Sequence, residues 1–235
     1  MFKSKKKIYA NNASWTFDKN VPKKFSHHIK QSVPYYEEGH DLICEVSDFF
    51  IKNKSIVYDI GSSTGTLLNK IQKRHMNKKI NFYGIETVKE MIIQAKKEHL
   101  NNRVRYLNKD INKIKLKRNN LTISYYTIQF IDPENRQNLI NKIYNCLKWG
   151  GAFIFFEKIR ASDARFQDIY VQTYNDFKLK NNFSEKEIIN KSRSLKGVLE
   201  PFSDFGNLGL LKRAGFVDII PIFQWMCFKG YLAIK

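Results

Sequence analysis

Short apolar runs alternate with stretches of helical periodicity along most of this chain. Runs rich in β-branched and aromatic residues predict strands at 55–60, 80–86, 104–109, 121–127 and 152–157, and a final pair around 216–223 and 228–234. Between them, apolar residues at helical spacing predict helices at 64–75, 88–99 and 134–147. Such alternation predicts an α/β fold, a doubly wound, mostly parallel sheet of seven strands.

Two helical segments are expected to cover this sheet. The pattern stays helical through 160–213, with helices expected at 165–180, 184–199 and 207–213. Ser184 and Glu187 have the spacing of a capping box, which strengthens the start of the middle helix. We therefore divide the chain into a covering segment at 1–50 with a helix at 39–52, a core at 51–159, a helical lid at 160–213, and C-terminal strands at 214–235. Gly150 and Gly151 predict a flexible turn before the strand at 152–157.

A glycine turn follows the first strand, in the string Asp59-Ile-Gly61-Ser62-Ser63-Thr-Gly65. A turn of this kind lets backbone N–H groups face a ligand at the carboxyl edge of a parallel sheet. A dinucleotide fingerprint needs three glycines spaced G-x-G-x-x-G, and the two glycines present here would hold a pyrophosphate poorly. The acidic Asp59 just before the turn instead matches the Asp-x-Gly motif of S-adenosylmethionine (SAM) enzymes. The turn favours SAM as the cofactor.

Acidic residues also end the next two strands. Glu86 is placed where a carboxylate can accept hydrogen bonds from both ribose hydroxyls of a nucleoside. Asp110 is placed to contact an adenine amino group. Either residue alone could be a solvated surface acid, but the order of acids at strand ends predicts a nucleoside site.

The composition of the chain limits the class of protein to which it can belong. With 235 residues and 43% hydrophobic content, the chain has the size and composition of one globular domain, and no apolar run approaches the ~20 residues of a membrane span. The N-terminus lacks the apolar stretch of a secretory signal, so we expect a cytoplasmic protein without a membrane partner. The scattered Cys44, Cys146 and Cys227 predict neither a disulfide framework nor a metal site.

The formal net charge of +19 raises the question of an anionic partner such as RNA or an acidic substrate. The lysines are spread among many asparagines and isoleucines, a pattern that genome base composition can produce without selection for binding. RNA binding is therefore weakly supported, and a small-molecule substrate is the partner that we expect.

Several longer strings occur together in an order typical of one family. They are Trp15-Thr-Phe-Asp18, Ser32-Val-Pro34, Tyr58-Asp-x-Gly61, Thr127-x-Gln-Phe130, Lys142-Ile-Tyr144, Gly150-Gly-Ala152, Glu157-Lys158, Asp176-Phe-Lys178 and Ala214-Gly-Phe216. From about residue 14 to its end, the chain resembles the carboxy-S-adenosyl-L-methionine (carboxy-SAM) synthases, which have a class I methyltransferase (Rossmann-like) fold.

The resemblance implies a homodimer that binds SAM. In the family's own reaction, a carboxylate from prephenate converts SAM to carboxy-SAM, the precursor of a wobble-uridine modification in tRNA. The family's cofactor-binding positions fall on Tyr36, Gly61, Ser62, Ser63, Glu86, Thr87, Asp110 and Ile111. With the motif residues Asp59 and Gly65, and with Tyr125 at the end of the fourth strand, these are the cofactor-binding residues that we expect.

Glu86 replaces a family aspartate and Thr87 a family asparagine, and two further departures are more serious. An arginine of the lid, which pairs with the extra carboxylate of carboxy-SAM, aligns with Ser192, and Arg193 follows one residue later. The family asparagine at the end of the fourth strand is replaced by Tyr125. A sheltered carboxylate without a cation is costly, so either Arg193 reaches the pocket or the enzyme no longer holds carboxy-SAM.

Three functions follow from these observations. The departures favour a diverged SAM-dependent methyltransferase that acts on a small molecule, because the sulfonium activates the methyl group and the enzyme chiefly aligns the acceptor and removes its proton. Tyr36 and Tyr125 are the candidate catalytic residues for that reaction. Carboxy-SAM synthesis with Arg193 as the carboxylate clamp is the first alternative. A non-catalytic role as an RNA-binding protein or a subunit is the second.

Overall fold

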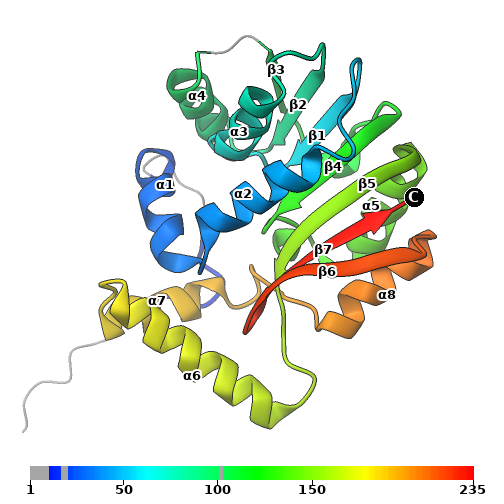
Figure 1. Ribbon diagram of the computed structural model, residues 1–235. Helices are drawn as coiled ribbons and strands as arrows, with labels where there is room; N and C mark the ends of the chain where they lie inside the picture. Colours follow the sequence, from blue (N-terminus) through cyan, green and yellow to red (C-terminus); the bar gives the residue numbers. More distant parts are fainter. Residues whose placement is uncertain (1–10, 17–20, 101–102) are drawn as a thin grey trace, which may run out of the picture.

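A computed structural model describes residues 11–16, 21–100 and 103–235 (Figure 1). Phe17 and Asp18, at the end of the first family string, lie outside the described residues. Within the described ranges, no helix combines the length and apolar character needed to cross a membrane.

The seven strands of the structure form one sheet with the order β3-β2-β1-β4-β5-β7-β6. Their bounds are β1 (Ile56–Ile60), β2 (Asn81–Glu86), β3 (Val104–Asn108), β4 (Asn119–Tyr125), β5 (Leu147–Lys158), β6 (Asp218–Trp225) and β7 (Phe228–Ile234). Strands β1 to β5 are parallel, and β7 pairs antiparallel with both β5 and β6. This arrangement confirms the doubly wound, mostly parallel sheet. The chain order reverses between β1 and β4, which is where ligands bind in such folds.

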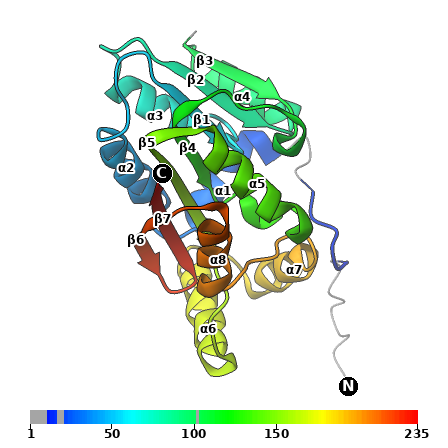
Figure 2. The same cartoon turned by 90° about the vertical axis from the view of Figure 1, so that its right-hand side faces the viewer.

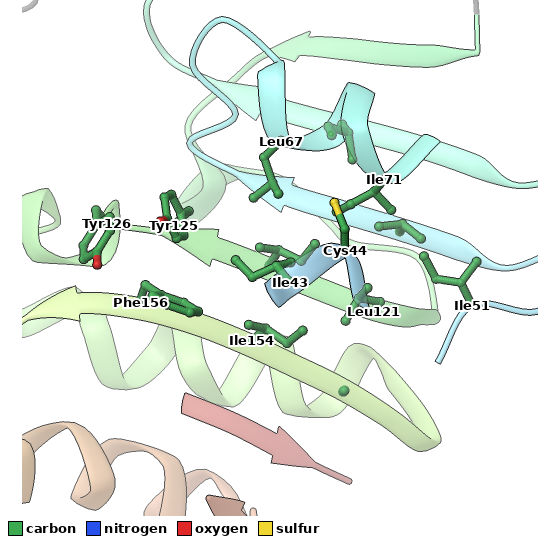
Figure 3. Packing of buried hydrophobic residues seen from close by; sticks show 14 of the residues in the cluster. Ile43, Cys44, Ile51, Leu67, Ile71, Leu121, Tyr125, Tyr126, Ile154 and Phe156 are labelled. Carbon is green, nitrogen blue, oxygen red and sulfur yellow. The ribbon is translucent and has the colours of Figure 1, made fainter. Parts of the chain in front are cut away.

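Helices cover both faces of the sheet (Figures 1 and 2). On one face, apolar residues of α2 (Tyr36–Ser47) and α3 (Thr66–Arg74) join the core cluster that contains Val57 of β1. The neighbouring Tyr58 points to the other face and joins α5 (Pro133–Cys146) and α8 (Asp204–Ala214). Alternation of side chains along each strand thus produces two cores. Figure 3 shows the first of them, with Tyr125 at the end of β4 and Tyr126 directly after it.

The remaining helices lie at the sides and at the carboxyl end of the parallel strands. They are α1 (Val21–Ser32), α4 (Lys89–Glu98), α6 (Ala164–Lys180), α7 (Glu185–Leu195) and the 3-10 turns η1 (Ile111–Lys113) and η2 (Ile128–Phe130). The predicted capping box is present: the Ser184 hydroxyl accepts a hydrogen bond from the Glu187 backbone, and the Glu187 carboxylate accepts one from the Ser184 backbone. Asp163 caps α6 in a similar way.

Three local features differ from the sequence-based expectation. The helix expected at 39–52 begins at Tyr36 and is preceded by α1, which the pattern analysis missed. The expected glycine turn at 150–151 lies inside β5, where Gly150 has a φ of 73° and the pairing with β4 shifts register. The strand therefore passes through an irregularity that glycine tolerates, rather than starting after a turn. The helix expected at 207–213 begins at Asp204 and packs on α5 (Figure 2). We refer to α6 and α7 as the lid helices.

Candidate active site

A large cavity of about 1400 Å³ opens at the carboxyl ends of the parallel strands. Its lining comes from the ends of β1, β2, β4 and β5, from α1 and α2, and from the lid helices α6 and α7. Most of the expected site residues line it: Tyr36, Asp59, Gly61, Ser62, Ser63, Glu86, Thr87, Asp110, Ile111 and Tyr125. Gly65 and Arg193 are outside its lining.

The glycine turn needs its glycines for backbone reasons. Gly61 and Gly65 have φ values of 72° and 75°, in the left-handed region. A side chain at Gly61 would collide with Thr127, and one at Gly65 would collide with the hydroxyl of Tyr106. Gly65 therefore shapes the start of α3 without lining the cavity itself.

Glu86 is held against the glycine turn. One carboxylate oxygen accepts a hydrogen bond from the backbone N–H of Ser63 at 2.9 Å, and the other accepts one from Val88 at 2.9 Å. Each carboxylate oxygen has a second lone pair, and among the described residues the only other contact is a long one of 3.4 Å from the rotatable Thr87 hydroxyl to the oxygen on the Val88 side. The carboxylate can therefore keep both backbone contacts and still accept hydrogen bonds from two ligand hydroxyls.

Asp59 lies beneath the turn with only 2% of its surface exposed. Burial, with a smaller contribution from Glu86, raises the pKa of its carboxyl to about 7. A cationic ligand group next to Asp59 would favour the ionised form and lower this pKa.

The loop that carries Asp110 and Ile111 is fixed from both sides. The Asp110 side chain accepts a hydrogen bond from the backbone N–H of Asn112 at 2.9 Å. The Lys142 ammonium of α5 donates to the carbonyls of Ile111 at 2.9 Å and Asn112 at 2.8 Å. Lys142 lies in one of the family strings, but its role could not be predicted from sequence, because no spacing rule links α5 to this loop.

An aromatic cluster fills the space between α2 and β4. The hydroxyl of Tyr125 donates a hydrogen bond to the backbone carbonyl of Tyr36 at 2.8 Å, and the two ring centroids are 5.1 Å apart. His40 packs 4.7 Å from the Tyr125 ring, and burial lowers the pKa of His40 to about 3. Burial raises the pKa of both Tyr36 and Tyr125 above the ordinary tyrosine value. All three side chains are thus neutral near pH 7, and the hydroxyl proton of Tyr125 is engaged in the hydrogen bond to the Tyr36 carbonyl.

Tyr126 has an unusual backbone. Its φ of 58° is rare for a bulky residue, and its N–H donates to the carbonyl of Phe156 at 2.8 Å. The side-chain amide of Gln129 stabilises this backbone conformation. It donates a hydrogen bond to the Tyr126 carbonyl and accepts one from the backbone N–H of Lys158 at 2.9 Å. Tyr126 lines the cavity, and its buried hydroxyl has no hydrogen-bond partner among the described residues.

Several cationic side chains line the cavity, among them Arg160 and Lys196, and three lysines of β5, α6 and α7 are central to its charge. Lys158, Lys178 and Lys191 all line it, whereas the neighbouring Arg193 is exposed. The Lys191 ammonium lies 2.8 Å from Nε2 of His28 and 3.0 Å from the hydroxyl of Ser32. Burial and the charges of Lys178 and Lys158 lower the pKa of Lys191 to about 8.

Glu157 and Lys158, which form one of the family strings, lie on opposite faces of the sheet, because successive strand residues point in opposite directions. Lys158 faces the cavity. Glu157 is buried and accepts a hydrogen bond from the backbone N–H of Ile128 at 3.1 Å. Burial raises the pKa of Glu157 to about 8.

Comparison with known proteins gives the family. Residues 57–151 match the methyltransferase domain family. A carboxy-S-adenosyl-L-methionine synthase of Staphylococcus epidermidis is 35% identical over 226 residues, which cover 96% of this chain and 99% of that protein. The chain belongs to the carboxy-SAM synthase family. A carboxy-SAM synthase of Sulfurimonas denitrificans is also 35% identical, over 93% of this chain and 94% of its own length.

Solved structures agree with the fold. Human N-acetylserotonin methyltransferase in complex with SAM superposes with a TM-score of 0.62 and 17% identity, over 93% of this chain and 56% of that one. An O-methyltransferase family protein of Burkholderia thailandensis gives a TM-score of 0.65 and 14% identity, over 93% of this chain and 60% of that one. The chain is thus a SAM-dependent transferase with the class I methyltransferase fold, and SAM is its cofactor or substrate.

Proposed function

We propose that this protein converts SAM to carboxy-SAM, with prephenate as the carboxylate donor. The SAM methyl group loses a proton, and its carbon forms a bond to the carboxyl carbon that leaves the prephenate ring. The ring hydroxyl leaves with that proton as water, and the remainder aromatises to phenylpyruvate. The names of the relatives support this reaction, and one observation in the cavity carries it.

That observation is the position of Lys191. Sequence alignment leaves Ser192 in place of the family's lid arginine, which suggested a pocket without a cation. In the structure, Lys191 lines the cavity one residue before Ser192. An ammonium has three N–H donors, and contacts to His28 and Ser32 use at most two of them. Lys191 can therefore donate to the added carboxylate of carboxy-SAM.

His28 supports this role of Lys191. Burial and the charge of Lys191 lower the pKa of His28 to about 4, so its ring is neutral near pH 7. A neutral Nε2 can accept a hydrogen bond from the ammonium and does not repel it. The contact orients Lys191 without neutralising its charge, which stays available to a ligand.

Methyl transfer to a small-molecule acceptor is the competing function. An arginine can clamp a carboxylate with two parallel hydrogen bonds, whereas a lysine acts as a point charge. The replacement of arginine by Ser192, with Lys191 alongside, thus gives a weaker carboxylate clamp than the family's own and favours divergence toward the simpler reaction.

Mass spectrometry separates the two functions. We would analyse the nucleoside released from freshly purified protein, and the products formed from SAM and prephenate, for the wild type and for Lys191→Met and Arg193→Met. We expect carboxy-SAM and phenylpyruvate from the wild type and from Arg193→Met, and a loss of both in Lys191→Met. If the wild type holds and forms no carboxy-SAM, the proposed reaction is wrong and the search turns to a methyl acceptor.

A further inference from the structure

A half-buried lysine, Lys158, and a buried one, Lys178, flank one tyrosine ring in the cavity. The ammonium of Lys158, at the end of β5, lies 4.3 Å from the ring centroid of Tyr174. The ammonium of Lys178, in the last turn of α6, lies 4.3 Å from the same centroid. Lys178 is only 7% exposed. The geometry concentrates two positive charges around a single aromatic side chain.

These charges have no acidic partner in the part of the chain that the structure describes. The ion pairs found there involve neither lysine. Burial and the charge of Lys158 lower the pKa of Lys178 to about 8, and burial also lowers the pKa of Lys158. A buried charge without a counter-ion is costly, and an anionic ligand between the lysines would remove that cost.

A neutral hydrogen-bond donor lies in the same region. The ring centroids of Tyr126 and Tyr174 are 5.7 Å and 5.2 Å from that of Phe228, and the Lys158 ammonium is 5.9 Å from it. The Tyr174 hydroxyl already donates to the carbonyl of Ser32 at 2.8 Å. The buried Tyr126 hydroxyl has no such partner among the described residues, and its strained backbone is of the kind found at ligand sites.

This cluster is separate from the cofactor edge. Glu86 ends β2, whereas Lys158 ends β5, and the sheet order places β1 and β4 between those two strands. The cavity therefore has an acidic side at β1 and β2 and a basic side at β5 and α6. Such a distribution suits a cationic sulfonium cofactor on one side and an anionic second substrate on the other.

We propose that Lys158, Lys178 and Tyr126 form a binding site for the carboxylate of the second substrate. The two ammonium groups provide charge, and the Tyr126 hydroxyl donates a hydrogen bond to a carboxylate oxygen. The identity of prephenate as that substrate rests on the proposed function, but the site for an organic carboxylate does not.

The test is calorimetric titration of prephenate into protein saturated with S-adenosylhomocysteine. The variants are Lys158→Gln and Lys178→Gln, and the matched control is Lys180→Gln, which changes an exposed lysine of the same helix. We expect the prephenate affinity to fall about tenfold or more in the first two variants, as for loss of a charge-assisted contact. Lys180→Gln should stay within about twofold of the wild type, and all variants should keep the wild-type affinity for S-adenosylhomocysteine.

Tyr126→Phe tests the third member of the site, because it removes the hydroxyl but keeps the ring. We expect prephenate affinity to fall about fivefold, as for one hydrogen bond, while S-adenosylhomocysteine affinity and thermal stability stay the same. Wild-type affinity in Tyr126→Phe would remove the hydroxyl from the site. Wild-type affinity in both lysine variants would overturn the site as a whole.

A second probe separates this proposal from the proposed reaction. Malonate is titrated into the same loaded proteins, whether or not carboxy-SAM is formed. If the wild type makes no carboxy-SAM but binds malonate through Lys158 and Lys178, the carboxylate site stands and the reaction is wrong. If the wild type forms carboxy-SAM but both lysine variants bind both carboxylates normally, the reaction stands and the site is wrong.

Discussion

The carboxylate of Glu86 accepts the backbone N–H of Ser63 at 2.9 Å, so the acid at the end of β2 is tied to the glycine turn after β1. This contact joins two strand ends that the cofactor must bridge. The turn and the acid are thus positioned together before any ligand arrives, which lowers the ordering cost of binding.

Replacement of Glu86 by alanine should remove SAM binding. The variant loses the acceptors for the ribose hydroxyls and also leaves the N–H groups of Ser63 and Val88 without their partner. We expect SAM affinity to fall by about a hundredfold or more, from the loss of several hydrogen bonds to a charged group. Calorimetry with SAM measures this, and Glu98→Ala, at an exposed acid of α4, is the control. An unchanged affinity in Glu86→Ala would take this residue out of the site.

Most of the fold could be predicted from sequence because its signals are local. Apolar runs and helical periodicity gave all seven strands and the helices of the core to within a few residues. The start of β5 could not be predicted in this way, because Gly150 and Gly151 are typical of turns, and only the pairing with β4 draws them into the strand. The preceding helix α1 was missed because its sequence is polar and basic.

The acidic side of the site could be predicted from sequence, whereas the basic side could not. Acids at the ends of β1, β2 and β3 can be found from sequence, since parallel strands place their carboxyl ends at one edge. The cavity lysines Lys158, Lys178 and Lys191 come from β5, α6 and α7, and no spacing rule brings them together. The family alignment pointed to Arg193 as the replacement for the missing arginine. In the structure, Arg193 of α7 is exposed, whereas Lys191 of the same helix lines the cavity.

The pH dependence of SAM binding should report on Asp59. Its pKa is about 7 in the folded protein, against an ordinary value of about 3.9 for the unfolded chain. The free protein should therefore lose stability as pH rises from about 4 to about 7, because the folded state binds the extra proton. SAM is cationic, so its affinity should rise as pH passes through 7. Asp59→Asn should flatten the affinity profile and reduce the slope of the stability profile, to which the buried Glu157 also contributes. A wild-type affinity profile in that variant would contradict the assignment.

Lys142 is expected to act as a positioning residue for the cofactor. Its ammonium donates hydrogen bonds to the backbone carbonyls of Ile111 and Asn112. Lys142→Met should let this loop move and weaken SAM binding about tenfold, which corresponds to about 1.4 kcal/mol. The kcat at saturating SAM should change much less, because the reacting groups are elsewhere. Lys113→Met, at an exposed lysine of the same loop, should bind SAM like the wild type.

Tyr125 should prove to be structural rather than catalytic. Its hydroxyl donates to the backbone carbonyl of Tyr36, so it is not available as a base. Tyr125→Phe should lower the free energy of unfolding by about 1 kcal/mol, measured by urea denaturation, with kcat within about threefold of the wild type. A loss of kcat of a hundredfold or more in a well-folded variant would restore Tyr125 as a catalytic residue.

The lid lysines predict opposite pH effects on the free protein and on its complex with a carboxylate. In the folded protein, the pKa values of Lys178 and Lys191 are about 8, against about 10.4 for an unperturbed lysine. Between these values the unfolded chain binds more protons, so the stability of the free protein should rise with pH. Carboxylate binding needs the charged form, so prephenate affinity should fall as pH rises above about 8.

Lys178→Arg provides the decisive variant for this effect, because arginine remains charged throughout the range. Its prephenate affinity should fall less steeply above pH 8 than that of the wild type, although Lys191 still titrates. Calorimetry at pH 7, 8 and 9 measures the slopes, and Lys180→Arg is the control on the exposed side of α6. If the slopes of the wild type and Lys178→Arg coincide, the loss of charge at Lys178 does not control carboxylate binding.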